Sequence, residues 1–563
     1  MAKRLKKNKK DASLEEIFSL IDKKRSFVLE AGAGSGKTWT LIESIKYVLK
    51  NKAEELKKNN QKIICITYTN VAADEIKNRI ENNLLVNIST IHDFLWNLIK
   101  DYQYELKEEI VECNKESKTP IEGLEDIIFE KDIRYFGYGR NFEKGIITHD
   151  DVILIASKIF DKYNKIVNIV INKYPFIFID EYQDTQPETV DILVEKVLAK
   201  GDKNIVIGFF GDSMQKIYNQ GVGKIENDLL QSVTKLENFR CSKRVIELLK
   251  KIRPELDQYP AGNNLDGDIY FFYCNNNLNK DDENYKKLRR TLEKNYGWDF
   301  NSPETKILML THKGIANKLD YPNLLNIYNK MSSYGRERLY EHEEAFSELF
   351  IEKIEKAVSL YEEERYGEFI DLLGIEGFKI TNHKDKIGIR KSMDRLIELR
   401  ENKKIKDVID YVFKNNLINK TLKIHNFEEL LKRGEEEKKI AFYNDLMKIK
   451  YSEVINLNNY IRKFTPFSTK HGIKGEEYNN VLVVIDDAAW NQYNFNEFLS
   501  GNKQNENRFN RSRNLFYVSC SRAKDQLAII SMSKIDKVAM ENIDQWFGVK
   551  NVFDVKNIKD SGF

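Results

Sequence analysis

Residues 27–38 read Phe27-Val28-Leu29-Glu30-Ala31-Gly32-Ala33-Gly34-Ser35-Gly36-Lys37-Thr38. The apolar residues predict a strand, the glycines predict a tight turn, and the sequence from Trp39 onward predicts a helix. Such a turn gathers backbone N–H groups at the positive end of a helix, which suits a polyphosphate. Lys37 can then reach the β- and γ-phosphates, and the Thr38 hydroxyl can bind Mg²⁺. The segment from Ala31 to Thr38 is therefore predicted to bind a nucleotide, although Ala31 replaces the first glycine of the eight-residue P-loop pattern.

A second motif supplies the carboxylates that phosphate hydrolysis needs. It reads Phe176-Ile177-Phe178-Ile179-Asp180-Glu181, an apolar strand that ends in two acidic residues. Asp180 can hold Mg²⁺ through its water shell, and Glu181 can orient and deprotonate the attacking water. A strand ending in Asp-Glu is common by chance, but downstream of a P-loop it becomes a specific signal of hydrolysis.

P-loops occur in kinases, transporters, GTPases and motors, so the class depends on further blocks of sequence. In chain order these blocks are Thr67-Tyr68-Thr69-Asn70, Ser89-Thr90-Ile91-His92, Gly211-Asp212-Ser213-Met214-Gln215-Lys216-Ile217-Tyr218, Glu237-Asn238-Phe239-Arg240, Thr469-Lys470-His471-Gly472-Ile473-Lys474-Gly475-Glu476-Glu477 and Val518-Ser519-Cys520-Ser521-Arg522. The ordered series resembles the UvrD/Rep/PcrA family of superfamily 1 helicases and spans roughly residues 27 to 530. The resemblance implies two RecA-like cores with an insertion in each, ATP hydrolysed in the cleft between them, and 3′ to 5′ movement along single-stranded DNA.

The resemblance also assigns roles around the nucleotide. Gln215 matches a glutamine that senses the γ-phosphate, and Arg240 and Arg522 match two arginines that reach the same phosphate, Arg522 from the second core. Together with Lys37, Asp180 and Glu181 these residues form the implied catalytic set. Phe239 matches a ring that stacks on adenine, and Glu477 matches a carboxylate that contacts the ribose. An isolated Phe239 could equally be an ordinary core aromatic.

The residues implied to line the DNA path carry hydroxyl, amide, imidazole or aromatic groups. Such groups bind phosphates or stack on bases without reading sequence. The two histidines of this set could instead be structural residues with satisfied hydrogen bonds. The set comprises Thr67, Tyr68, Thr69, Asn70, His92, Tyr218, Thr469 and His471.

Short β-rich apolar runs alternate with helical patterns along the chain, which predicts an α/β fold with mostly parallel sheets. The runs fall into two groups, which suggests two parallel-sheet cores in series. The resemblance implies that these are two RecA-like P-loop NTPase cores in tandem, each interrupted by a mostly helical insertion. The predicted domains are a basic arm (1–12), a first core (13–96 and 166–240), a first insertion (97–165), a second core (241–320 and 456–550), a helical second insertion (321–455) and a tail (551–563).

Composition excludes several classes of protein. The 563 residues carry 91 Lys+Arg against 88 Asp+Glu, a net charge of +3, so any nucleic-acid surface must be local. The sequence has no run of about 18 apolar residues, so no membrane partner is expected. The five cysteines stand singly, which argues against a zinc site or a disulfide framework and favours a cytoplasmic protein.

The sequence departs from the family pattern in ways that keep two functions open. Asn219, Gln220 and Gly221 stand where the family has a large aromatic residue, and no glutamine precedes the P-loop between Asp11 and Glu30. Only about 40 residues follow Arg522, too few for an appended nuclease domain. Compact proteins of this kind resemble the helicase-like subunit of Gabija-type anti-phage systems, which act beside an OLD-family nuclease.

We therefore carry two hypotheses forward. The first is an ATP-dependent translocase or helicase on single-stranded or 3′-tailed DNA, in DNA repair or anti-phage defence. The alternative is a DNA-end or nucleotide sensor that hydrolyses ATP and regulates a partner nuclease without productive unwinding. A P-loop transporter or kinase lacks its own signatures in this sequence.

Overall fold

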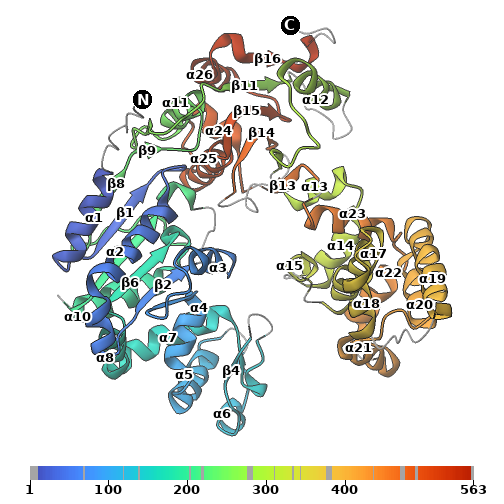
Figure 1. Cartoon of the computed structure of the whole chain (residues 1–563), viewed down its shortest axis with the longest axis horizontal. Helices are drawn as coiled ribbons and strands as arrows, with labels where there is room; N and C mark the ends of the chain where they lie inside the picture. Colours follow the sequence, from blue (N-terminus) through green and yellow to red (C-terminus); the bar gives the residue numbers. More distant parts are fainter. Residues whose placement is uncertain are drawn as a thin grey trace. The chain divides into compact units, whose positions relative to one another are not determined.

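The computed structural model describes most of the chain, and its helices and strands form two compact units (Figure 1). The described residues are 11–67, 70–117, 120–136, 140–201, 204–216, 221–274, 283–309, 311–332, 335–340, 342, 344–375, 383–434, 436–463, 465–469, 476–487 and 492–558. The first unit comprises residues 1–269, 493–527 and 538–549, and the second comprises 270–492, 528–537 and 550–563.

The first unit is built on a six-stranded parallel sheet in the order β3-β2-β6-β7-β1-β8. Its strands are β1 (Phe27–Ala31), β2 (Ile63–Thr67), β3 (Val86–Thr90), β6 (Phe176–Asp180), β7 (Val206–Gly211) and β8 (Gln231–Lys235). The pairing of Phe27 with Gly208, and of Phe178 with the same glycine, places β7 between β1 and β6. Both faces of the central strands are apolar because helices cover both sides.

Alternation along each strand divides the apolar side chains between the two faces. Phe27 and Leu29 pack into a cluster with helices α1 (Ala12–Asp22), α2 (Lys37–Lys58) and α3 (Asn70–Arg79). Val28 and Ile179 pack into the opposite cluster with residues from other helices. Those helices are α4 (Ile91–Ile99), α5 (Gln103–Lys115), α6 (Leu124–Ile128), α7 (His149–Lys162), α8 (Asn164–Lys173) and a π-helical segment, Ile192–Leu198.

Further helices and two strand pairs complete the first unit. They are α9 (Pro187–Asp191), α10 (Ala199–Gly201), α11 (Lys243–Ile252), α24 (Phe495–Ser500), α25 (Glu506–Cys520), α26 (Lys537–Phe547, whose first residue belongs to the second unit), and the strand pairs β4 (Arg134–Tyr135) with β5 (Ile146–Ile147) and β9 (Glu237–Asn238) with β10 (Tyr259–Pro260). Helix α11 packs against α25, so the chain from residue 493 to 527 returns to the unit that holds the P-loop.

The second sheet has six strands in the order β13-β12-β14-β15-β11-β16. They are β11 (Asp268–Tyr273), β12 (Thr305–Met309), β13 (Phe467–Thr469), β14 (Tyr478–Ile485), β15 (Ala523–Ser531) and β16 (Val552–Asp554). Phe272, Leu482 and Ile530 pack on one face with residues of α12 (Glu283–Tyr296) and α13 (His312–Lys318). Two parallel sheets covered by helices confirm the predicted α/β fold class.

The second unit also contains a helical region with a hydrophobic core of its own. Its helices are α14 (Pro322–Met331), α15 (Gly335–Tyr340), α16 (Ala345–Glu348), a π-helical segment (Leu349–Glu355), α17 (Lys356–Glu362), α18 (Tyr366–Ile375), α19 (His383–Asn402), α20 (Ile405–Lys414), α21 (Leu422–Arg433), α22 (Glu437–Leu446) and α23 (Ser452–Ile461). Within the part of this region that is described, all the regular elements are helices.

Gly208 gives a test of core packing in the first sheet. A Cβ atom at this position would lie 2.6 Å from Phe27 Cζ and 2.9 Å from Phe178 Cδ1. We expect Gly208→Ala to lower the free energy of unfolding by about 1–3 kcal/mol, because the added methyl group overpacks the ring cluster. Gly388→Ala, in α19 with open space around the new Cβ, should instead raise it by up to about 1 kcal/mol. If chemical denaturation gives the same change in the free energy of unfolding for both substitutions, the packing around Gly208 is contradicted.

Candidate functional site

The P-loop leaves the carboxyl end of β1 and leads directly into α2. Gly34 (φ 73°) and Gly36 (φ 79°) have left-handed backbone conformations that favour glycine. A Cβ on Gly34 would also lie 2.6 Å from Asn238 Oδ1. Lys37 is the first residue of the 22-residue helix α2. The loop therefore presents its backbone N–H groups at a helix N-terminus, as an anion site requires.

Three side chains form hydrogen bonds with Ala33, in the middle of this loop. The Ala33 carbonyl accepts hydrogen bonds from Asn238 Nδ2 (2.9 Å) and Gln258 Nε2 (3.1 Å). The Ala33 N–H donates to the hydroxyl of Tyr517 at 3.1 Å. Tyr517 lies on α25, so this helix contributes directly to the shape of the loop.

Phe239 lies at the edge of the same loop. Its backbone N–H donates to the Gly34 carbonyl at 2.9 Å, while its ring is 52% exposed. The sequence left two interpretations of Phe239 open, a ring that stacks on adenine and an ordinary core aromatic. The exposure of the residue excludes the second. Arg240 follows it, half-buried, with its backbone N–H bonded to Asn238 Oδ1 at 3.0 Å.

The two adjacent carboxylates follow β6 and are held in a defined geometry. Asp180 is buried, and its Oδ1 accepts the Glu181 N–H at 3.1 Å. Glu181 has a φ of 50°, a left-handed conformation that costs a non-glycine residue of the order of 1–3 kcal/mol. Gln183 Nε2 donates to Glu181 Oε2 at 2.5 Å and so fixes the direction of the carboxylate.

Gln215 and Arg522 contact each other beside these carboxylates. Arg522 Nη2 donates to Gln215 Oε1 at 3.2 Å, and Gln215 Nε2 donates to Asp212 Oδ2 at 2.8 Å. Burial, and next the nearby positive charge of Arg240, lower the pKa of Arg522 to about 10. The two arginines are thus close enough to repel each other, and an anion between them would relieve that repulsion.

The compact unit that contains Arg522 is also the one that contains Lys37. The sequence assigns these residues to different cores, but in the structure the hydrogen bonds of Tyr517 and Arg522 tie residues 493–527 to the P-loop and its neighbours. Glu477 belongs to the second unit, where it is exposed just before β14.

Two charged residues in this region were not predicted from the sequence. Glu30, at the end of β1, accepts hydrogen bonds from Tyr182 Oη (2.5 Å) and Ser213 Oγ (2.7 Å). Arg253, at the end of α11, forms ion pairs with Glu30 and with Asp212. The one available signal was an acidic residue ending an otherwise apolar strand, because the partners of Arg253 are far away in sequence.

The residues predicted to contact DNA are only partly described. Tyr68, Thr69, Tyr218 and His471 lie outside the described residues, and only the backbone positions of Asn70, at the start of α3, and Thr469, at the end of β13, are described. Thr67 is buried at the end of β2, and His92 is half-buried in the first turn of α4. Thr67 and His92 thus follow the carboxyl ends of the neighbouring strands β2 and β3.

His92 packs against a second histidine. The ring centroids of His92 and His149 are 4.3 Å apart, and His149 Nδ1 is hydrogen-bonded to the Tyr135 hydroxyl. Burial and the charge of His149 lower the pKa of His92 to about 4, against opposing effects of Asp150 and Asp93. His92 is therefore neutral at pH 7.

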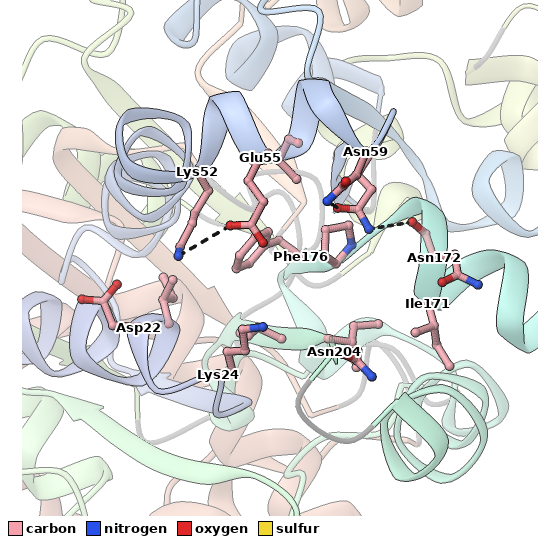
Figure 2. Close-up of a pocket in the computed structure, with 15 residues that line it drawn as sticks. Asp22, Lys24, Lys52, Glu55, Asn59, Ile171, Asn172, Phe176 and Asn204 are labelled. Carbon is pink, nitrogen blue, oxygen red and sulfur yellow. Dashed lines mark hydrogen bonds and ion pairs between the residues drawn. The ribbon is translucent and has the colours of Figure 1, made fainter.

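A pocket of about 240 Å³ lies elsewhere in the first unit (Figure 2). Its lining includes Asp22 at the end of α1, Glu55 and Asn59 near the end of α2, and Phe176 at the start of β6. The P-loop, in contrast, leaves the carboxyl end of β1. The pocket therefore lies at the amino ends of the strands and is not the phosphate site.

Two further observations bear on metals and membranes. In the described ranges, no three His, Cys, Asp or Glu side chains are gathered as a metal ion would need. Among the helices that the structure describes, none is long and apolar enough to cross a membrane.

Comparison with known proteins agrees with the geometry. Residues 15–135 and 137–235 match the UvrD/REP helicase N-terminal domain. The chain is 28% identical to Gabija protein GajB of Bacillus cereus, over 97% of this chain and 99% of that protein. It is 24% identical to the ATP-dependent DNA helicase Rep of Buchnera aphidicola, over 88% of this chain and 89% of Rep. It is 25% identical to the ATP-dependent DNA helicase PcrA of Staphylococcus aureus, over 42% of this chain and 39% of PcrA.

The lowered pKa of His92 predicts an effect of acid on stability. Between pH 6.5 and about 4 the unfolded chain takes up a proton at His92 that the folded chain does not, so this residue makes stability fall as pH falls. We expect His92→Gln to flatten the decline of the denaturation midpoint across this window. His425→Gln, which removes an exposed histidine of α21, serves as the control. If the denaturation midpoint of His92→Gln declines with falling pH as steeply as that of the parent, the burial of a neutral imidazole at this position is contradicted.

Proposed function

We propose that the chain, which is similar to UvrD/REP helicases, is a UvrD-like helicase of superfamily 1 that hydrolyses ATP to move 3′ to 5′ along single-stranded DNA. The observation that carries the proposal is the contact between Arg522 and Gln215 beside the P-loop and Glu181. A phosphate-binding loop, an oriented carboxylate and a buried arginine in one compact unit are the parts that phosphoryl transfer to water requires.

The residues of the loop fit a nucleoside triphosphate. Within the described part of the chain, the Ser35 hydroxyl is buried in the loop without a hydrogen-bond partner. A Cβ at Gly32 would lie 2.4 Å from Gln258 Cδ, so the backbone there must stay bare. Lys37 and Thr38, both half-buried, follow the loop as the first two residues of α2. We assign the phosphates of ATP to this cradle, with Ala31 to Thr38 around them.

The magnesium ion that accompanies ATP would be held by the Thr38 hydroxyl directly and by Asp180 through its water shell. Such a site suits Mg²⁺, which keeps much of its water shell. When bound, the ion neutralises charge on the phosphates. Asp180 is buried at the end of β6, and β7 lies between β6 and the P-loop strand β1.

Hydrolysis would follow from the positions of three further residues. Glu181, turned by its left-handed backbone and held by Gln183, takes the proton of the attacking water. Arg240 and Arg522 stabilise the negative charge that develops on the transferred phosphoryl group. In the same proposal the exposed Phe239 stacks on the adenine, and the role of Glu477 at the ribose rests on the family resemblance alone.

The DNA track rests on the arrangement of the first sheet. Thr67 and His92 follow the carboxyl ends of β2 and β3, the edge from which the P-loop also leaves β1. A neutral His92 can exchange hydrogen bonds with a phosphate or a base without adding charge. We assign Thr67 and His92 to this track on these grounds, while Tyr68, Thr69, Asn70, Tyr218, Thr469 and His471 are assigned to it by the family resemblance alone.

A second candidate function is regulation of a partner nuclease by a DNA-end or nucleotide sensor. The near-full-length similarity to Gabija protein GajB favours it, as does the absence of an aromatic residue at positions 219–221. In that case the partner would be a nuclease of the OLD family, in a cytoplasmic anti-phage system. ATP turnover at the same residues is common to both candidates.

Glu181→Gln tests the assignment of the base. We expect ATP to bind with parental affinity while kcat falls by at least about 10²-fold, because the amide keeps the size of the side chain but cannot accept the proton. A fluorescent ATP analogue reports binding, and phosphate release reports turnover. Glu188→Gln, at an exposed position of α9, should behave as the parent. Unchanged kcat in Glu181→Gln would remove this residue from the role.

Arg522→Lys tests whether DNA acts through the buried arginine, and it keeps a positive charge where Arg522→Ala would leave a cavity. We expect single-stranded DNA to stimulate ATP hydrolysis in the parent, and this stimulation to fall by at least about tenfold in Arg522→Lys, since a single ammonium cannot replace the guanidinium fork.

Displacement of a strand from a 3′-tailed duplex, with a 5′-tailed duplex as control, distinguishes the two candidate functions. Displacement restricted to the 3′ tail supports the motor. DNA-stimulated hydrolysis without displacement supports the sensor. Hydrolysis indifferent to DNA would contradict the motor and the DNA-end sensor, and would favour a nucleotide sensor whose site is gated by a partner protein.

A further inference from the structure

We propose that Arg253 is a positioning residue of the ATPase site, which sets the orientation of the Gln215 amide through the carboxylate of Asp212. This inference rests on the proposed ATP hydrolysis and adds to it a residue outside the sequence motifs. The Arg253 side chain forms ion pairs with Glu30 and Asp212 and would act on the site through these partners.

Arg253 is a buried cation at the junction of several elements. It is the residue that follows α11, where its N–H caps the helix by bonding to the Leu249 carbonyl. Its side chain is 4% exposed. Nη1 donates to Asp212 Oδ1 at 2.6 Å, Nη2 donates to Glu30 Oε1, and the Tyr517 ring centroid lies 5.7 Å from the guanidinium carbon. Each terminal nitrogen therefore holds a different carboxylate.

The orientation of Gln215 follows from how Asp212 is held. Asp212 Oδ1 is engaged by Arg253 and by the Met214 N–H (3.1 Å), which leaves Oδ2 facing Gln215. Gln215 Nε2 donates to that oxygen at 2.8 Å, so its Oε1 must point the other way, where it accepts from Arg522 Nη2 at 3.2 Å. A flipped amide would place two donors against each other at Arg522 and two acceptors against each other at Asp212.

Glu30 anchors the other end of the guanidinium to the P-loop strand. Burial opposes ionisation of Glu30, but the hydrogen bond from Tyr182, the charge of Arg253 and the hydrogen bonds from Ser213 lower its pKa overall. The carboxylate is thus ionised, and Arg253 joins the end of β1 to the residue that follows β7. Two carboxylates in fixed directions require the planar fork of arginine, which a lysine does not reproduce.

The arrangement separates two kinetic effects. Ala33, in the P-loop, is held by Tyr517, whose ring centroid lies 5.7 Å from the Arg253 guanidinium carbon, and also by Asn238 and Gln258, whose bonds to the Ala33 carbonyl would remain in an Arg253 variant. Nucleotide binding should therefore survive a change at Arg253. The contact between Gln215 and Arg522 depends on the fixed Asp212 carboxylate. A change at Arg253 should therefore lower the rate of turnover.

The test compares Arg253→Lys and Arg253→Gln with the parent in the full chain, by steady-state ATP hydrolysis with saturating single-stranded DNA. We expect kcat to fall at least about tenfold in both variants while KM for ATP stays within about threefold, the pattern of an interaction lost only in the transition state. Arg253→Lys keeps a charge between the carboxylates, so it remains informative if Arg253→Gln does not fold.

Arg400→Gln is the matched control, because Arg400 is also buried and paired with a buried carboxylate, Glu355, at 3.4 Å, but in the helices of the second unit. Its melting temperature should fall as in Arg253→Gln, with kcat unchanged. If Arg253→Lys keeps the parental kcat, or loses it only in proportion to a rise in KM, the positioning role is overturned. If the parent itself does not hydrolyse ATP, the proposed function fails instead.

Discussion

A carboxylate buried away from water must be matched by donors, and the site is organised around one such group. Asp212 is fully buried, and its two oxygens and its N–H are engaged by Arg253, Gln215, Met214 and Gln183. Removing any one of these partners from a buried charge is far more costly than the same change at the surface. The positions of Gln215, Arg522 and Glu181 are therefore coupled, since each shares a hydrogen bond with Asp212 or with one of its partners.

Parallel strands turn distant sequence motifs into neighbours. Because β6, β7 and β1 are adjacent and point the same way, their carboxyl ends bring together Glu181, Asp212 and the P-loop, although more than a hundred residues separate the P-loop from the other two. β8 then leads to Asn238, which holds the loop from its other side. The sheet needs only backbone hydrogen bonds and apolar side chains, which leaves the polar residues at its edge available for chemistry.

The parts that could be predicted from sequence are those with a local signal. Apolar runs such as Phe176 to Ile179 predict buried strands, and glycines next to Lys37 predict the phosphate loop. The strands β3 and β8 lie at the sheet edges, where their partly or largely exposed residues form no apolar run that would predict a buried strand. Arg253 was missed for another reason: its partners are fixed by the tertiary fold, and nothing in the residues around it distinguishes it from a surface arginine after a helix.

The two arginines near Gln215 show why such a site favours an anion. Arg522 is fully buried, and both burial and the charge of Arg240 act against its ionisation, with only partial relief from Glu181 and Asp212. A charged pair of this kind has unfavourable energy until negative charge arrives between its members. In the proposed hydrolysis that charge would develop on the transferred phosphoryl group, which both arginines would attract more strongly in the transition state than in the ground state. The repulsion between the two arginines would in this way favour turnover.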